Sequence, residues 1–116
     1  MTTLYGIKNC DTVKKAKSWL ESRDIEFVFH DFRANGLSET QVAGWISDLG
    51  LDTLINRRST TWKALDESTK NSLDESSAVA IILANPTLIK RPLLDINGTR
   101  QVGFKADQYS TLFNKD

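Results

Sequence analysis

The sequence predicts an α/β fold built on a four-stranded mixed sheet. Three observations lead to this prediction: a β-α-β pattern covers residues 2–32, helical patterns fill the centre of the chain, and a β-β-α pattern covers residues 93–113. The two strands of a β-α-β unit run parallel, whereas a tight hairpin pairs its strands antiparallel. The 116 residues suffice for one domain with a single core and are too few for two.

The N-terminal β-α-β unit is recognised from its hydrophobic periodicity. Residues 2–7 are predicted as a strand, and residues 12–22 as a helix with one apolar face and lysines elsewhere. Residues 25–32 are rich in aromatic and β-branched side chains, which favour a second strand. A right-handed crossover should place this strand parallel to the first.

The central segment is predicted to consist of helices. Ser38 and Gln41 form a capping box, which starts a helix with an apolar stripe at helical spacing. Shorter helices fit residues 51–54 and 62–65. The apolar run at residues 78–84 suits a buried strand or a helix; its alanines, the polar cluster before it and the Asn-Pro pair after it favour helix.

The C-terminal part is predicted as a hairpin followed by a helix. Residues 93–96 and 99–104 flank Asn97-Gly98, whose residues readily adopt the positive φ angles of a type I′ turn. A helix over residues 106–113 closes the chain. This order of elements is that of a thioredoxin-like sheet. We therefore expect a single thioredoxin-like domain over residues 1–116, with a helical insertion at about residues 36–85.

Composition limits the classes of partner. Fifteen basic side chains balance fifteen acidic ones, so no bulk charge indicates binding to nucleic acid or to an anionic membrane. No apolar run approaches the roughly 20 residues that span a bilayer, and the N-terminus lacks the features of a signal peptide. We expect a cytoplasmic protein, and a monomer because no surface motif indicates an oligomer.

Cys10 is the single cysteine of the chain and precedes a predicted helix. Unpaired N–H groups and the helix dipole at such a position favour a thiolate, which is the nucleophilic form. The alternative is a small buried hydrophobe, since free cysteines are often inert. With one cysteine and one histidine, the chain can form neither an internal disulfide nor a zinc site of soft ligands, so we expect no metal and no bound cofactor. A redox cycle would need an external thiol, such as glutathione or a partner protein.

Several cations are candidates for holding an anion beside this thiol. Arg57, Arg58 and Arg91 offer the bidentate donors that suit an oxyanion, and Lys8 lies two residues before the cysteine. Each of them is otherwise an ordinary solvated surface charge. Pro92 immediately precedes a predicted strand, where it is either a cis-proline beside a site or an ordinary trans residue.

Three segments, residues 5–16, 56–62 and 85–94, together resemble the ArsC/Spx family, and within it the YffB-type reductases. The resemblance implies a thioredoxin-like fold with a helical insertion, a catalytic cysteine at Cys10, and an arginine before a cis-proline at Arg91 and Pro92. The family's middle arginine falls on Arg57 or Arg58, and the choice between them stays open.

Two positions depart from the family pattern. Arsenate reductases carry a further arginine where this chain has Gly103, with Lys105 nearby. Spx regulators with a redox switch carry a second cysteine where this chain has Val13. Both departures weaken the corresponding functional assignments, although binding to a partner such as RNA polymerase is still compatible with the sequence.

The function expected from these observations is that of a glutathione-dependent thiol reductase. Cys10 would be the nucleophile, an external thiol would resolve the intermediate, and Pro92 would shape the site. The expected anion-binding residues are Arg91, Arg58, Arg57, Lys8, Asn9 and Thr12. Two alternatives remain: an arsenate reductase that uses glutathione and glutaredoxin, and a non-catalytic Spx-like module that binds a protein partner.

Overall fold

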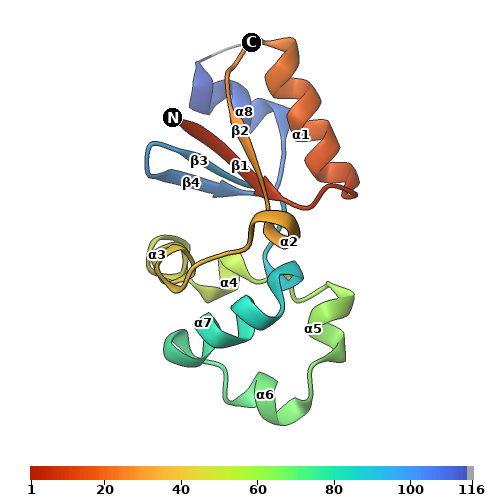
Figure 1. The fold of residues 1–116 in the computed structure, drawn as a ribbon, viewed down its shortest axis with the longest axis vertical. Helices are drawn as coiled ribbons and strands as arrows, with labels where there is room; N and C mark the ends of the chain where they lie inside the picture. Colours follow the sequence, from red (N-terminus) through yellow and green to blue (C-terminus); the bar gives the residue numbers. More distant parts are fainter. Residues whose placement is uncertain (115–116) are drawn as a thin grey trace. The chain divides into compact units, whose positions relative to one another are not determined.

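The computed structural model describes residues 1–114 and shows the predicted alternation of strands and helices (Figure 1). In chain order the elements are β1 (Thr2–Gly6), α1 (Asp11–Ser22), β2 (Val28–Asp31), α2 (Phe32–Asn35), α3 (Glu39–Leu49), α4 (Leu51–Leu54), α5 (Thr60–Ala64), α6 (Glu67–Asn71), α7 (Glu75–Ala84), the 3₁₀ helix η1 (Pro86–Leu88), β3 (Leu93–Ile96), β4 (Thr99–Val102) and α8 (Ala106–Phe113). Within residues 1–114, no helix is both long enough and apolar enough to cross a bilayer.

The chain forms two compact units. The sheet unit contains Met1–Asn35 and the chain from Arg91 onward, and the helical unit contains Gly36–Lys90. The helical unit therefore extends past residue 85, the expected end of the insertion, because η1 and the segment up to Lys90 still pack with the central helices. Asn56 N donates to Leu88 O at 2.8 Å, and Lys90 N donates to Leu54 O at 2.8 Å.

The sheet unit is built on the predicted four-stranded mixed sheet. Its strand order is β2-β1-β3-β4, with β1 parallel to β2 and the other pairs antiparallel. Gly6 pairs with Asp31 in β2, Tyr5 pairs with Leu93 in β3, and Leu93 pairs with Val102 in β4. The ends of β1, β2 and β4 therefore lie beside the start of β3 at one edge of the sheet, the edge formed by strand ends and not by an outer strand.

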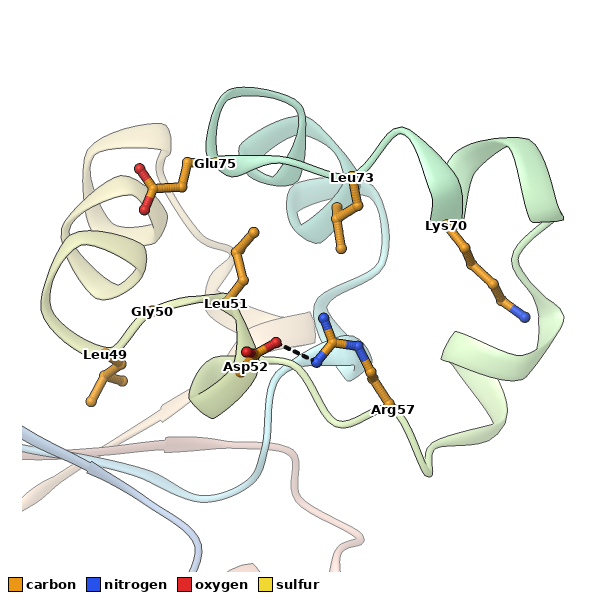
Figure 2. A pocket seen from close by; sticks show the side chains of 8 residues that line it. All are labelled: Leu49, Gly50, Leu51, Asp52, Arg57, Lys70, Leu73 and Glu75. Atoms are coloured by element: carbon orange, nitrogen blue, oxygen red, sulfur yellow. Dashed lines mark hydrogen bonds and ion pairs between the residues drawn. The ribbon is translucent and has the colours of Figure 1, made fainter.

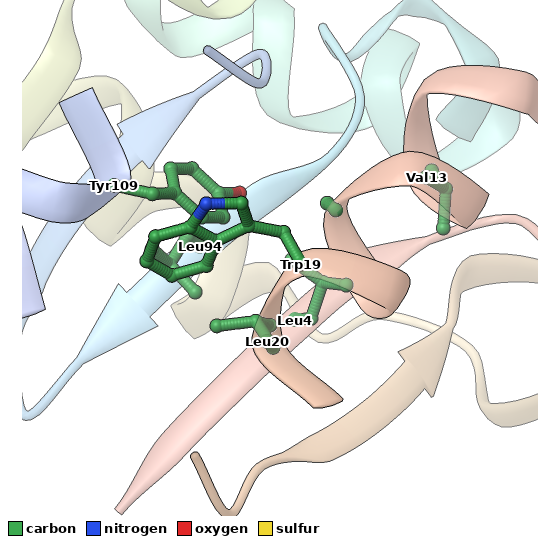
Figure 3. Packing of buried hydrophobic residues seen from close by; sticks show 7 residues of the cluster. Leu4, Val13, Trp19, Leu20, Leu94 and Tyr109 are labelled. Carbon is green, nitrogen blue, oxygen red and sulfur yellow. The ribbon is translucent and has the colours of Figure 1, made fainter. Parts of the chain in front are cut away.

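Helices α1 and α8 cover the same face of this sheet. Leu4 of β1 and Leu94 of β3 belong to one buried cluster with residues of both helices: Val13, Ala16, Trp19, Leu20 and Tyr109. Figure 3 shows Trp19 of α1 lying against Tyr109 of α8, and their rings meet edge to face with centroids 5.6 Å apart. Burial of this apolar surface is the main stabilising term for the unit.

The helical unit is organised by side-chain caps. The predicted capping box of Ser38 and Gln41 is present at the start of α3, and a second one, of Asp74 and Ser77, starts α7. Helix α3 packs on α7, and Ile55 and Ile89 form an antiparallel bridge. The helical interpretation of the apolar run at residues 78–84 is therefore correct, and the cap extends that helix back to Glu75.

Several predicted boundaries were wrong for local reasons. The second strand, predicted over residues 25–32, is only Val28–Asp31. It ends at Asp31 because the carboxylate of this residue accepts from the N–H groups of Arg33 and Ala34 and starts α2. The fourth strand ends at Val102 because Gly103 turns the chain with φ +80°. Helices α2 and α6, which begin at aspartate caps, and the 3₁₀ helix η1 were not predicted, because such short helices have too few residues to show a period.

Candidate functional site

Cys10 is the N-cap residue of α1, which begins at Asp11, one residue before the predicted start. Its backbone is extended, with φ −112° and ψ 123°, and its carbonyl accepts from Lys14 N at 3.0 Å. No side chain caps this helix end, so the N–H groups of the first turn are left for the half-buried thiol or a bound anion. This arrangement suits a nucleophilic sulfur.

A close helix–strand contact positions this helix end. Gly6, the last residue of β1, has no room for a side chain, since a Cβ there would lie 2.7 Å from Val13 Cγ2. Val13 is fully buried in the first turn of α1. The glycine therefore lets α1 pack directly over the end of β1, and the four-residue loop from Ile7 to Cys10 joins the two elements.

Asp31 anchors the cysteine loop from the neighbouring strand. Its Oδ2 accepts from Lys8 N at 3.2 Å, two residues before Cys10, while its Oδ1 accepts from Arg33 N at 2.7 Å and Ala34 N at 3.1 Å. Desolvation raises the pKa of Asp31, but the three N–H donors and the charge of Arg33 outweigh it, and the net pKa lies below the usual value.

Arg91 and Pro92 lie at the same edge of the sheet as the cysteine loop. The register places the end of β1 beside the start of β3, where these two residues are found. Their peptide bond is cis, as the resemblance implies, and Pro92 O accepts from Gly103 N at 2.9 Å. Arg91 is half-buried, and its guanidinium has no hydrogen-bond or ion-pair partner within the described part of the sheet unit.

The remaining predicted residues of the sheet unit belong to this edge as well. Lys8 and Asn9 are exposed in the cysteine loop, and Thr12 is half-buried in the first turn of α1. Lys8 contributes its backbone to the Asp31 anchor, which leaves its ammonium group exposed. The edge thus combines one thiol, two cations and the uncapped end of a helix.

Arg57 and Arg58 belong to the helical unit and differ in their surroundings. Arg57 forms an ion pair with Asp52 at 2.7 Å, which Figure 2 shows, and its guanidinium lies 5.3 Å from the centre of the Trp62 ring. Arg58 is exposed, and its side chain has no partner among the described residues of its own unit. Of the two, Arg58 is the arginine whose donors are available.

A cavity of about 540 Å³ lies beside Arg57 in the helical unit (Figure 2). Its charged lining residues are Asp52, Arg57, Lys70 and Glu75. The opposite charges balance, and in Figure 2 the Lys70 ammonium points away from the Arg57–Asp52 pair. Within residues 1–114, no cluster of three His, Cys, Asp or Glu side chains has a geometry that could hold a metal ion.

Asp31 is the functional candidate that sequence reasoning missed. The predicted strand over residues 25–32 includes Asp31, and a strand position gives this aspartate no role in the site. The available signal was the residue type, since Asp is preferred at helix N-caps, and the structure shows its Oδ1 accepting from Arg33 N and Ala34 N. Its bond to Lys8 joins residues 23 positions apart, so only the folded chain reveals it.

The sheet order and the helix that follows β1 define a thioredoxin-like protein, with its one cysteine at the N-terminus of that helix. The profile of the ArsC family matches residues 5–112. The chain therefore belongs to the ArsC family.

Individual proteins are similar over nearly the whole chain. An uncharacterised protein of Haemophilus influenzae is 48% identical over 113 residues, which cover 97% of this chain and 99% of the other. The global transcriptional regulator Spx of Streptococcus mutans is 29% identical over 118 residues and matches 100% of this chain and 85% of its own.

Two solved structures are also similar. A protein described as YFFB superposes with a TM-score of 0.91 at 43% identity, covering 96% of this chain and 97% of the other. An arsenate reductase (ArsC) related protein from Brucella melitensis superposes with a TM-score of 0.77 at 41% identity, covering 97% and 93%. Relatives of this chain thus include both reductase-related proteins and regulators.

Proposed function

We propose that this protein is a glutathione-dependent thiol reductase with Cys10 as its only nucleophile. The Cys10 thiolate attacks the glutathione sulfur of a mixed disulfide, forms a Cys10–glutathione disulfide and releases the substrate as a thiolate. A second glutathione thiolate attacks the glutathione sulfur of that intermediate, regenerates the Cys10 thiolate and leaves as oxidised glutathione. Overall, the mixed disulfide and one glutathione thiolate give the substrate thiolate and oxidised glutathione, so atoms and electrons balance.

The position of Cys10 carries this proposal. The single thiol of an ArsC-family chain lies at a helix end that no side chain caps. A thiolate formed there gains the dipole and N–H interactions that a neutral thiol does not. Because the chain has no second cysteine, the intermediate must be resolved by an external thiol. Glutathione is the small thiol whose carboxylates match the cations of this edge.

We assign the anion-binding role to residues of the same edge and to one arginine of the helical unit. Arg91 has a guanidinium without a partner in its unit and offers a carboxylate two parallel N–H donors. Lys8, Asn9 and Thr12 flank the thiol and would contact the glutathione backbone or its carboxylates. Between the two central arginines we favour Arg58, because Arg57 is already paired with Asp52 and packed on Trp62.

The first experiment measures reduction of the mixed disulfide of glutathione and 2-mercaptoethanol, with glutathione, NADPH and glutathione reductase supplied. We expect Cys10→Ser to abolish turnover while its thermal unfolding matches that of the wild type. Mass spectrometry after treatment with oxidised glutathione should show an adduct on Cys10 that forms faster than on an unstructured cysteine peptide. Full activity of Cys10→Ser, or no turnover by the wild type, would show that the proposed function is wrong.

The same assay separates the arginines and the substrate classes. Arg91→Ala should raise KM for the glutathione mixed disulfide about tenfold, the loss of one charge-assisted contact. Arg58→Ala should lower activity more than Arg57→Ala. Replacing the mixed disulfide by arsenate, with glutaredoxin added, tests the family's other reaction; we expect less turnover because Gly103 offers no guanidinium there. Efficient arsenate turnover would favour the arsenate reductase instead.

A further inference from the structure

The sheet unit has an open groove of about 540 Å³ between α1 and the segment that follows β4. Its floor is aromatic, with Trp19 from α1 and Phe104 from the chain before α8. Its rim is basic, with Lys14, Lys15 and Arg23 among the lining residues. All of these residues belong to the sheet unit.

The charge of the groove has one sign. Three cations line it and no carboxylate does. Lys14 and Lys15 are exposed, and neither forms an ion pair in the described part of the chain, not even with Asp11 one turn earlier on the same helix. Asp107 follows the lining residue Ala106 and does not itself line the groove. A ligand that lies here meets two lysine charges that no ion pair among the described residues neutralises.

The floor of the groove is held rigidly. Phe104 meets Tyr109 edge to face with centroids 4.8 Å apart, and Tyr109 meets Trp19 in the same way at 5.6 Å. The Arg23 guanidinium lies 4.5 Å from the centre of the Trp19 ring and donates to Ser22 Oγ at 2.6 Å. A rigid aromatic floor with a fixed cation above it lowers the ordering cost of binding.

The groove begins one helical turn from the nucleophile. Lys14 follows Cys10 by one helical turn, and its N–H bonds the Cys10 carbonyl at 3.0 Å. Cys10 and Phe104 also pack against the same buried cluster. One helical turn rises only about 5–6 Å, and each residue of an extended peptide spans about 3.3 Å. A peptide whose cysteine reacts at Cys10 therefore reaches the groove with the residues next to that cysteine.

We propose that this groove binds an acidic segment of a protein substrate whose cysteine is reduced at Cys10. This inference rests on the proposed reductase function and specifies its substrate class. The basic rim would pair with Asp or Glu side chains, and the aromatic floor would take an apolar neighbour. We expect the acidic ligand to be a polypeptide and not a nucleic acid, because the ligand must present a cysteine sulfur to Cys10.

The test for binding uses the Cys10→Ser chain, so that no reaction contributes. A fluorescein-labelled peptide with Asp and Glu around a central cysteine, and a second with Lys at those positions, are titrated by anisotropy. We expect the acidic peptide to bind more tightly, and its affinity to fall with rising ionic strength. Equal binding of both peptides, or no binding of the acidic one, overturns the proposal.

Charge reversal locates the binding surface. Lys14→Glu and Lys15→Glu should each weaken binding of the acidic peptide by about fivefold or more. Lys63→Glu is the matched control, because it makes the same charge change on an exposed helical lysine of the other unit. An equal loss in Lys15→Glu and Lys63→Glu would mean that net charge alone attracts the peptide, and the proposal is then wrong.

A kinetic comparison separates this proposal from the reductase function itself. In the otherwise wild-type chain, Lys15→Glu should raise KM for the glutathionylated acidic peptide and leave KM for the small mixed disulfide unchanged. If neither substrate is reduced, the reductase function fails while the binding data stand on their own. If both are reduced with KM values that Lys15→Glu does not change, the groove is not a substrate site.

Discussion

At the residue scale, one carboxylate holds two structural elements of the candidate site. Asp31 Oδ1 caps α2 through two N–H groups, and Asp31 Oδ2 binds the N–H of Lys8 in the cysteine loop. A substitution by asparagine can distinguish the roles of these two oxygens. An asparagine has one carbonyl oxygen, which would keep the two cap bonds, and its NH₂ group would then face the Lys8 N–H with no acceptor.

Asp31→Asn should therefore release the loop without unfolding α2. We expect reductase turnover and the alkylation rate of Cys10 with iodoacetamide both to change several-fold, with little change in the free energy of unfolding. Asp66→Asn is the control, because Asp66 caps α6 through Thr69 N and belongs to the other unit. Equal alkylation rates in Asp31→Asn and the wild type would show that the anchor does not position the thiol.

Tyr109 is a second residue with a specific consequence. Its hydroxyl is fully buried and has no hydrogen-bond partner among the described residues. A buried unpaired hydroxyl costs about 1–3 kcal/mol, so Tyr109→Phe should raise the free energy of unfolding by about 1 kcal/mol. Urea denaturation measures this difference. A loss of more than about 1 kcal/mol would instead indicate a hydrogen bond to the hydroxyl.

The same residue predicts a dependence on alkaline pH. Burial raises the pKa of the Tyr109 hydroxyl, so the folded state keeps the proton that the unfolded chain loses near pH 10. Because this pKa is raised, ionisation of Tyr109 does not change the free energy of unfolding below about pH 10. Above that pH it lowers the free energy of unfolding, by up to about 1.4 kcal/mol per pH unit. Tyr109→Phe should lose stability less steeply than the wild type in denaturation series between about pH 9 and 11.

At the scale of the elements, the contact between β1 and α1 sets the position of the nucleophile. Gly6→Ala would place a Cβ 2.7 Å from Val13 Cγ2, so α1 must move away from the strand. We expect a loss of about 1–3 kcal/mol in the free energy of unfolding and a changed alkylation rate of Cys10.

Val13→Ala supplies the control for this steric argument. The double variant Gly6→Ala, Val13→Ala removes the methyl group that clashes, so its loss should be smaller than the sum of the two single losses. Additive losses in the double-mutant cycle would show that the Gly6–Val13 contact does not set the helix position.

At the scale of the whole molecule, the neutral net charge hides a division between the two units. The sheet unit has ten basic and eight acidic side chains, and the helical unit has five basic and seven acidic ones. Helices α3 and α7 of the helical unit contain no lysine or arginine, whereas α1 carries three lysines. Charges separated in this way create local fields that the net charge does not show.

This division predicts retention on ion exchangers of both signs. Near its pI of about 6.6 and at low ionic strength, the protein should bind a cation exchanger through α1 and an anion exchanger through α3 and α7. Lys15→Glu should shorten retention on the cation exchanger more than Lys63→Glu does, although both variants have the same net charge. Equal shifts on the column would mean that net charge alone governs retention.

Sequence reasoning reached most of the fold because most elements are encoded locally. The Ser38–Gln41 box, the Asn97–Gly98 turn and the periodicity of α1 each lie within a few residues, and all three are present. The missed elements α2 and α6 are single turns held by Asp31 and Asp66 caps. Such turns have too few residues to show a period.

The candidate site was predictable only in part. Cys10 at a helix start follows from a strand-loop-helix pattern, which is local. The resemblance marked both Arg57 and Arg58, and only their contacts distinguish them, since one is paired with Asp52 and the other is not. The groove between Trp19 and Phe104 is lined by residues far apart in the chain, so no local sequence pattern predicts it.

The sequence by itself determined the order of the strands and longer helices and the lone thiol at a helix N-terminus, because each depends on composition or on neighbours along the chain. It also determined that a redox cycle, if the protein has one, needs an external thiol. The tertiary structure alone decided that Asp31 anchors the cysteine loop, that the Arg91–Pro92 segment lies at the same sheet edge, and that a basic groove begins one turn from Cys10. These features depend on strand register and helix packing, which bring together residues that no periodicity relates.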